Sequence, residues 1–274
     1  MKTFHFTVRI WAGSCRSEIR FRPMSWHGSP QHSTAMRARA GDPLPPLWHY
    51  GLFLGMTPTA LLGEDGHPPR GGFMPPVKLP RRMFAGSALR FEAPLICGEE
   101  ASKVSEITSV DLRRGKSGDL VFVGVRVAIT QGGQTCIQEQ QTIVYRSDLR
   151  PSAPADLPAD RLGHEKAHWL PSTTELFRFS ALTFNAHRIR YDLPYAQDKE
   201  GYPGLVVHGP LTALRLCAQA EQAVGALKTF SFRAEAPLFA GLPVAFTKAI
   251  DGTTCQVAAL RWDGVTAMTA MAEF

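Results

Sequence analysis

The sequence predicts an α+β fold built from two copies of one unit, in which a curved antiparallel sheet packs against a helix. Three observations lead to this prediction. Runs rich in β-branched and aromatic residues occur in both halves of the chain. A single long amphipathic helix is predicted at residues 209–227. A seven-residue segment at 92–98 recurs at 235–241, which indicates an internal duplication.

The first half opens with a segment that is unsuited to regular structure. Residues 41–80 are dense in Pro and Gly, and only residues 47–54 could form a short helix. Two strands are then predicted at residues 121–129 and 136–145. The sequence QGGQ at residues 131–134 predicts a hairpin turn between them.

The second half contains the long helix and most of the predicted strands. Pro210 suits the first helical position, where its missing N–H removes no hydrogen bond. Leu211, Leu214, Ala218 and Val224 give the helix an apolar stripe. Strands are expected near residues 175–182, at Val206, and at residues 229–234, 243–250, 255–262 and 265–274.

The repeat defines the predicted unit. EAPLICG at 92–98 and EAPLFAG at 235–241 are identical at five of seven positions, and each precedes antiparallel strands. One helix wrapped by a curved antiparallel sheet is the hot-dog arrangement, so two copies predict a double hot dog. We expect a degenerate hot-dog half at 41–146, a Pro-, Ala- and Asp-rich linker at 147–163, and a half carrying the active site at 164–274.

Residues 1–40 do not show the pattern of either half. They contain six arginines, a single acidic residue, Glu18, and poor apolar periodicity. We therefore predict a disordered extension outside the fold. An Arg- and Ser-rich, acid-poor start is also typical of a mitochondrial transit peptide, which remains the alternative to the predicted cytoplasmic location.

Composition excludes several function classes. Apolar residues make up 44% and charged residues 20% of the chain, and no stretch is long and apolar enough for a membrane span. The net charge of +6 is spread along the chain without a basic stripe interleaved with aromatics, which argues against nucleic acid and is compatible with an anionic ligand such as a coenzyme A ester. Five scattered cysteines predict neither a disulfide framework nor a zinc ribbon.

The segment FSALTFNAHRIRYDLPYAQDKEGYPGLVVHGPL, residues 179–211, is the most informative part of the chain. Together with LPPLWHYGLFL, GGFMPPVKLPRRM and EQQTIVYR in the first half, it resembles the MaoC-like hydratases. The resemblance is to the branch of 3-hydroxyacyl-thioester dehydratase type 2 and mesaconyl-C4-CoA hydratase, and it runs from about Gly41 to Phe274. It implies a hydro-lyase that adds or removes water across the 2,3 bond of an acyl thioester. The coenzyme A would be part of the substrate, and neither a metal nor another cofactor is expected.

The chemistry of such a reaction assigns roles to this segment. An enolate-like transition state needs its oxygen stabilised, and the backbone N–H of Gly209 at a helix start could do this. His187, the only imidazole in the loop, is the predicted group for proton transfer, with Asn185 as its polar partner. Arg190, Tyr191, Asp192 and His208 complete the predicted site as substrate-binding residues.

The match to the wider hydratase class is imperfect, and two registers remain open. Relatives use an Asp and a His five positions apart. One register places Asn185 and Arg190 at these positions, and the other, aligned on His187, places Leu182 at the Asp position. Asn cannot take a proton, and Arg stays protonated. Two rival functions follow, a hot-dog thioesterase and a non-catalytic acyl-thioester binding protein.

Two further motifs and the oligomeric state complete the sequence-based expectations. Residues 164–168 match HExxH, but no long apolar helix surrounds them, so a zinc protease is not expected. Residues 115–117 resemble the end of a phosphate loop without its first glycine and predict a hairpin turn. A homodimer is expected.

Overall fold

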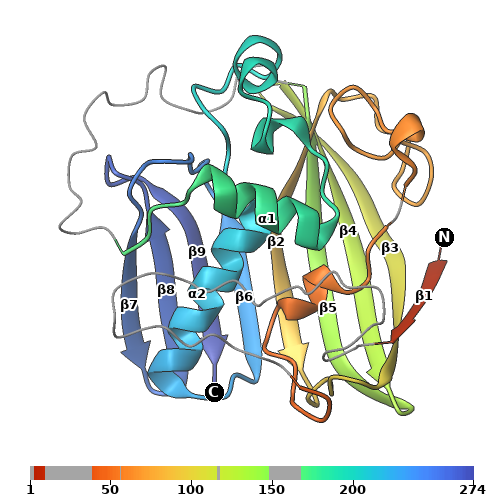
Figure 1. Cartoon of the computed structure of the whole chain (residues 1–274), viewed down its shortest axis with the longest axis vertical. Helices are drawn as coiled ribbons and strands as arrows, with labels where there is room; N and C mark the ends of the chain where they lie inside the picture. Colours follow the sequence, from red (N-terminus) through yellow and green to blue (C-terminus); the bar gives the residue numbers. More distant parts are fainter. Residues whose placement is uncertain (1–2, 10–38, 56, 116–117, 148–167) are drawn as a thin grey trace.

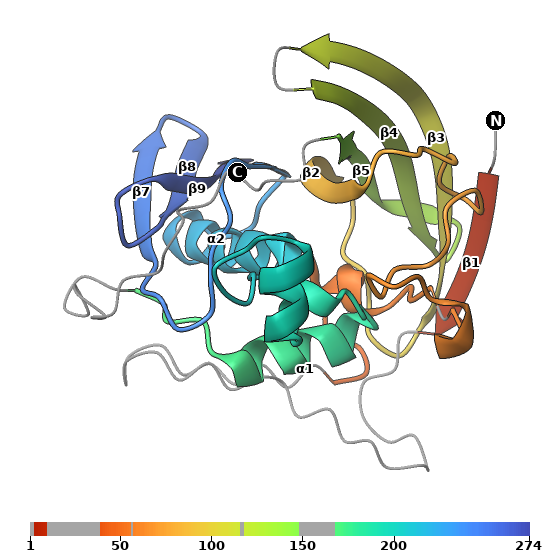
Figure 2. The same ribbon diagram turned by 90° about the horizontal axis from the view of Figure 1, so that it is seen from above.

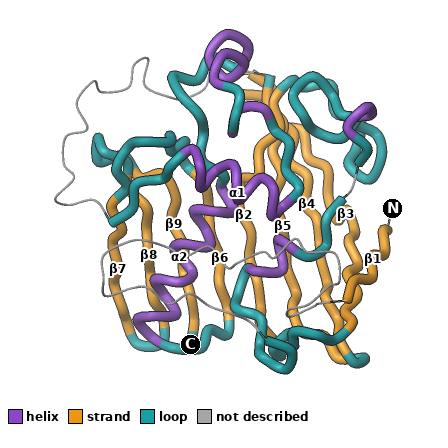
Figure 3. Tube along the Cα trace, in the orientation of Figure 1, coloured by secondary structure: helices purple, strands orange, loops and turns teal. Residues whose placement is uncertain are grey.

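The computed structural model describes residues 3–9, 39–55, 57–115, 118–147 and 168–274. Within them, nine strands form one sheet in the order β1-β3-β4-β5-β2-β6-β9-β8-β7, and all neighbouring strands are antiparallel (Figures 1 and 3). The strands are β1 (Thr3–Arg9), β2 (Arg81–Phe91), β3 (Glu100–Gly115), β4 (Gly118–Gln131), β5 (Gln134–Arg146), β6 (Thr229–Ala234), β7 (Ala245–Asp251), β8 (Thr254–Leu260) and β9 (Thr266–Glu273).

The helices lie on one face of a strongly bent sheet (Figure 2). They are α1 (Thr173–Thr183), α2 (Gly209–Val224), the 3-10 turns η1 (Trp48–Gly51), η2 (Thr59–Leu61) and η4 (Arg188–Arg190), and the π-helical turn η5 (Tyr195–Lys199). None of the helices in the described ranges is long and apolar enough to cross a membrane.

Strands β1 to β5 come from the first half of the chain and β6 to β9 from the second. Among the described residues, the two halves pair only through β2 and β6, where Gly86 lies opposite Arg233 and Arg90 opposite Thr229. Gly86 also follows an irregularity in the β2–β5 register, and a side chain there would collide with the carbonyl oxygen of Phe232. The central strand pair therefore needs a glycine at this point.

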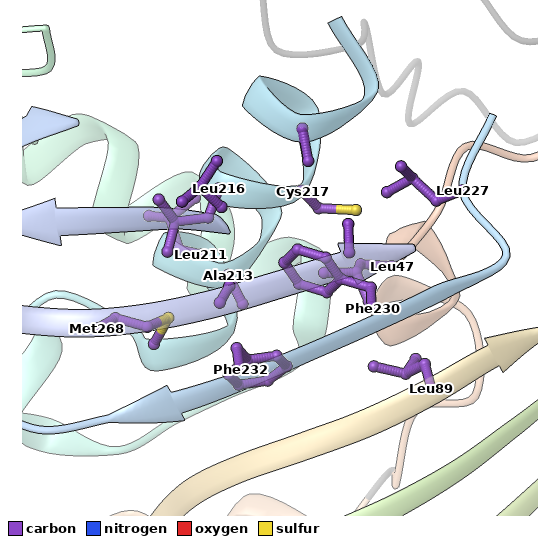
Figure 4. Packing of buried hydrophobic residues seen from close by; sticks show 14 of the residues in the cluster. Leu47, Leu89, Leu211, Ala213, Leu216, Cys217, Leu227, Phe230, Phe232 and Met268 are labelled. Atoms are coloured by element: carbon purple, nitrogen blue, oxygen red, sulfur yellow. The ribbon is translucent and has the colours of Figure 1, made fainter. Parts of the chain in front are cut away.

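Helix α2 is the centre of the hydrophobic core. Its side chains Leu211, Leu216 and Cys217 are almost fully buried against β6, β8 and β9, where Phe230 and Met268 are also buried. Figure 4 shows these side chains gathered between the helix and the strands. Burial of such side chains is worth roughly 1.5–3 kcal/mol each, which fixes the helix on the sheet.

The repeated segments have the same structure in both halves. The N–H groups of Glu92 and Ala93 both donate to the carbonyl oxygen of Cys136, and those of Glu235 and Ala236 both donate to Ala267. Isolated bridges then join Ile96 to Pro43 and Phe239 to Val206. The chain after Val206 enters α2, whereas the chain after Pro43 enters only the short turn η1. The first half is thus a hot-dog unit whose helix has shrunk, and the fold is an α+β double hot dog.

The structure corrects three expectations about local structure. Residues 175–182 form helix α1 instead of a strand, because Ser172 accepts the N–H of Glu175 (3.1 Å) and caps the helix, while Leu176 and Phe179 share its buried face. Val206 forms a single bridge and no strand.

The third correction concerns the N-terminus. Residues 3–9, expected to be part of a disordered extension, form β1 and pair with β3 from Thr3–Glu106 to Arg9–Glu100. The rest of the expected extension up to residue 38, and the expected linker from residue 148, lie outside the described residues. The half boundaries that we expected from the sequence remain a proposal.

Gly86→Ala tests the junction between the halves. An added β carbon would lie 2.4 Å from the oxygen of Phe232, so β2 and β6 must separate locally. We expect a loss of roughly 2–3 kcal/mol in unfolding free energy, measured by urea denaturation. Gly55→Ala, where no atom lies within 4 Å of the added carbon, is the matched control and should change stability by less than about 0.5 kcal/mol. Equal stability of the two variants would contradict the proposed constraint.

Candidate active site

A cavity of about 390 Å³ lies where the two halves meet. Its polar lining comes from the first half, from the loop after α1, from the start of α2 and from the end of β6: Asp65, His67, Arg81, Arg82, Arg146, Asn185, His187, Arg190, Glu200, Tyr202, Gly209, Thr212 and Glu235. A larger hollow of about 820 Å³ runs along β2, β6, β8 and β9, but no imidazole, carboxyl or thiol lines it. The smaller cavity is therefore the candidate active site.

The loop after α1 carries two of the predicted catalytic residues. It begins at Phe184, a left-handed residue (φ 51°) that ends the helix. The side-chain oxygen of Asn185 accepts the backbone N–H of His187 (3.0 Å), which holds the loop in shape. His187 is buried, and its ring makes no hydrogen bond to any described residue. Burial and the neighbouring charges of His67 and Arg190 hold the pKa of His187 far below its usual value, so its ring is neutral.

A second imidazole, His67, reaches the cavity from the first half. Its Nδ1 lies 3.0 Å from Oδ2 of Asp65, and its backbone N–H donates to Oδ1 of the same carboxylate (2.9 Å). The two imidazole rings of His67 and His187 lie against each other, with centroids 4.1 Å apart and a tilt of 47°. Burial lowers the pKa of His67 below 6.5, and the Asp65 carboxylate offsets only part of this effect. These bonds also hold the pKa of Asp65 well below its usual value despite its burial.

Residues 64–66, just before His67, are in close backbone contact with the loop after α1. Gly66 has φ 82°, and a β carbon on it would lie 1.8 Å from the carbonyl oxygen of Ala186. Arg188 donates its backbone N–H to the oxygen of Asp65 (3.0 Å) and a guanidinium N–H to that of Glu64 (3.2 Å). Only glycine can satisfy both the backbone angle and the contact at position 66.

Two guanidinium groups line the cavity without a carboxylate partner among the described residues, those of Arg82 and Arg190. Arg190 donates to the carbonyl oxygens of Val206 and Val207 (both 2.8 Å), and its buried Nε has no partner in this part of the chain. Burial lowers the pKa of Arg190 to about 10, so it stays charged at neutral pH. Beside burial, which has the largest effect, both cations lower the pKa values of His67 and His187.

Gly209 is the first residue of α2 and lines the same cavity. The first N–H groups of a helix have no partner inside it, and the helix dipole makes this end attractive to negative charge. Among the described residues, no backbone acceptor takes the N–H of Gly209. The nearest atoms to an added β carbon would be the Phe84 oxygen at 3.9 Å and the Met268 methyl at 4.0 Å, so the Cα is not crowded either. Such a donor can stabilise an oxyanion that forms beside it.

Three of the predicted substrate-binding residues do not line the cavity. Tyr191 is half exposed and donates to the Ala186 oxygen (3.1 Å). Asp192 pairs with Arg188 (2.7 Å). His208 is fully buried, and its Nε2 lies 2.9 Å from the hydroxyl of Ser180. These side chains support the loop and the start of α2 from outside the cavity.

The structure brings Asn185, His187, Arg190 and Gly209 together and adds residues that the sequence analysis did not single out, above all Asp65, His67 and Arg82. Of the HExxH segment, residues 164–167 lie outside the described residues, and His168 accepts the backbone N–H of Phe246 (2.9 Å) away from the cavity. The GKS segment lies at the β3–β4 connection, of which residues 116–117 are not described.

The fold is a double hot dog, and its cavity holds two imidazoles beside a helix start, groups that can carry out acid–base chemistry on a thioester. The model of the family hydroxyacyl-thioester dehydratase type 2 matches residues 47–240, and the chain belongs to this family. Its enzyme class is therefore that of the hydro-lyases acting on acyl thioesters.

Two relatives agree with the family assignment, and a solved structure agrees with the fold. The chain is 46% identical over 238 residues to mesaconyl-C4-CoA hydratase of Chloroflexus aurantiacus, with 85% of each chain covered. It is 28% identical over 229 residues to the mitochondrial hydroxyacyl-thioester dehydratase type 2 of Schizosaccharomyces pombe, covering 73% of this chain and 76% of that one. A Mycobacterium tuberculosis protein described as a double hot dog superimposes with a TM-score of 0.55 at 12% identity, over 99% of this chain and 95% of that one.

The buried imidazoles make stability depend on pH. The pKa values of His67, His187 and His208 are lowered in the folded state, so below about 6.5 the unfolded chain takes up protons first. We expect the unfolding free energy, measured by urea denaturation, to fall as the pH drops from 7 to 5. Glu221 acts in the opposite direction, because burial raises its pKa to about 7. Glu221→Gln should therefore steepen the fall; an unchanged or shallower slope would contradict this account.

Gly209→Pro tests the helix start by removing its N–H. An oxyanion donor acts mainly in the transition state, so we expect kcat to fall by roughly 10²–10³-fold with a smaller change in substrate affinity. Circular dichroism must first show that the Pro–Pro sequence leaves the fold intact. A folded variant with the original turnover would show that the amide of Gly209 is not the oxyanion donor.

Proposed function

We propose that the chain reversibly hydrates the 2,3 double bond of a coenzyme A thioester whose acyl group carries a free carboxylate. The observation that carries this proposal is the pair of cavity guanidiniums, Arg82 and Arg190, that have no carboxylate partner among the described residues. Arg190 has a buried Nε, whereas Arg82 is half-buried. A buried cation without a counter-ion is costly, and a substrate carboxylate would remove this cost. Arginine binds a carboxylate through two parallel hydrogen bonds, which also fixes its orientation.

The comparison with the Chloroflexus protein supports the same substrate class. Mesaconic acid is an unsaturated dicarboxylic acid, so its mono-thioester retains one free carboxylate. The name of that relative, mesaconyl-C4-CoA hydratase, and its 46% identity make mesaconyl-C4-CoA the first substrate to test. We also propose a cytoplasmic location and a homodimer, as expected from the sequence; the mechanism needs neither.

The cavity residues fit the steps of hydration. The Gly209 N–H would bind the thioester oxygen and stabilise the enolate that forms when water adds to the β carbon. An imidazole would accept the proton of that water and return a proton to the α carbon. Asn185, with its side-chain oxygen occupied by the His187 N–H, could still donate to the attacking water or to the substrate through its amino group. Atoms balance with water alone, so the proposal requires no metal or redox cofactor.

A substrate panel tests the proposal. The protein is incubated with mesaconyl-C4-CoA and with crotonyl-CoA, which lacks the second carboxylate, and products are followed by mass spectrometry and by a free-thiol assay. We expect the gain of one water, without thiol release, and a higher kcat/KM for the carboxylated ester. Thiol release without hydration would identify a thioesterase, and binding without turnover would identify a binding protein; either result contradicts the proposal.

Arg82→Gln tests the carboxylate partner. We expect kcat/KM for the carboxylated ester to fall by about 10–10²-fold, because a charge-assisted hydrogen bond worth roughly 1.5–3 kcal/mol is lost. Turnover of crotonyl-CoA should stay within about threefold of the original. Arg90→Gln is the matched control, since Arg90 lies on the same strand β2 but is exposed and paired with Glu92 (3.1 Å). An equal loss on both substrates would show that Arg82 does not recognise the carboxylate.

A further inference from the structure

Hydration needs a group that takes and returns a proton. The loop after α1 does not supply an imidazole that is hydrogen-bonded to a carboxylate among the described residues. Asn185 has no proton-accepting group, and Arg190 is charged and hydrogen-bonded to two carbonyl oxygens. Within the described part of the chain, His187 is an imidazole without a carboxylate partner. Among the residues that line the cavity, Asp65 and His67 are the only carboxylate and imidazole joined by a hydrogen bond, with 3.0 Å between Oδ2 and Nδ1.

We propose that His67 is the catalytic acid–base of this enzyme and that Asp65 is its positioning residue. This inference rests on the proposed function and assigns the proton transfer to the first, degenerate half of the chain. Asp65 accepts a hydrogen bond from Nδ1 of His67 and so leaves Nε2 as the nitrogen with the free lone pair. That nitrogen belongs to a ring that lines the cavity.

His67 is better suited to proton transfer than its neighbour His187, because the Asp65 carboxylate can balance the positive charge of a protonated His67 ring. When a buried imidazole takes a proton, the new charge must be balanced. The carboxylate of Asp65 lies in direct contact with the His67 ring and can balance it there. His187 has only the more distant effect of Asp65 and faces Arg190 and, after proton uptake, His67 itself. The structure therefore assigns proton transfer to His67 and leaves His187 as the neutral ring that holds it in place.

The reaction can be written with a single imidazole. Nε2 of His67 takes one proton from water as the water oxygen bonds to the β carbon, and the electron pair of the double bond moves toward the thioester carbonyl. The resulting enolate oxygen is held by the Gly209 N–H. The imidazolium then gives its proton to the α carbon, which restores the carbonyl and the neutral ring. Water is consumed, one C–O and one C–H bond form, and the enzyme returns to its starting state.

The backbone contact at Gly66 explains how a residue from the first half can act in the site of the second. With Gly66 pressed against the Ala186 oxygen, the chain on either side is held by Arg188, which binds the carbonyl oxygens of Glu64 and Asp65. These contacts set the 4.1 Å ring separation between His67 and His187. The position of His67 is therefore fixed by backbone atoms, as a catalytic group requires.

The test compares single variants on the enoyl thioester that the original protein hydrates. His67→Gln should lower kcat by about 10²–10⁴-fold while the affinity for the saturated analogue succinyl-CoA stays within threefold. His187→Gln should lose less than about tenfold. His168→Gln is the matched control, since this exposed histidine contacts Phe246 outside the cavity and should leave kcat unchanged.

Asp65→Asn gives a readout that a structural role would not move. The carboxylate raises the pKa of His67, so its removal lowers that pKa further. We expect the acidic limb of the kcat/KM profile to shift to lower pH while kcat falls, with the unfolding midpoint near the original.

The outcomes separate the inference from the proposed function. If the original protein hydrates no enoyl thioester, the proposed function fails. If it does hydrate one and His67→Gln retains more than a tenth of kcat, or His187→Gln loses as much as His67→Gln, the assignment to His67 is overturned. An acidic limb that stays in place in Asp65→Asn overturns the role of Asp65.

Discussion

The close approach of Gly66 to the carbonyl oxygen of Ala186 is the constraint on which the site depends. It joins a segment of the first half to the loop after α1, at a distance that excludes any side chain. Arg188 stabilises the same contact by donating hydrogen bonds to the carbonyl oxygens of Glu64 and Asp65. The contact thereby holds the ring of His67 against that of His187, at the cavity that both residues line.

This constraint also accounts for the electrostatics of the cavity. Bringing two imidazoles and the cations Arg82 and Arg190 into one buried space pushes both histidine pKa values down. Asp65 is the one group in contact with an imidazole that counters this, and it does so for His67. The same burial that makes the rings neutral bases costs stability when the pH falls, so function and acid sensitivity share one physical origin.

Much of the fold could be predicted from the sequence. The strands after residue 229 lie within a few residues of their predicted bounds, and α2 begins at Gly209 as expected. Helix α1 was missed because alternating apolar residues at 177–182 look like a strand, and only the Ser172–Glu175 cap reveals the helix. Phe4, Phe6 and Val8 alternate with polar residues, a pattern that predicts a strand at residues 3–9. The Arg-rich composition of the rest of residues 1–40 favoured a disordered extension instead. Asp65 and His67 could not be placed, because their contact with residues about 120 positions away is set by tertiary docking.

The difference between the two hot-dog units has a geometric consequence. The helix of the second unit, α2, has 16 residues, whereas the corresponding turn of the first unit, η1, has four. A full helix would have coiled that length of chain into a compact rod over its own sheet. Instead, the described residues between η1 and β2 form only the short turn η2, and Asp65 and His67 among them contact the loop after α1 of the second unit. The candidate site is therefore composite, because residues of the first unit, which lacks a long helix, and residues of the second unit line one cavity.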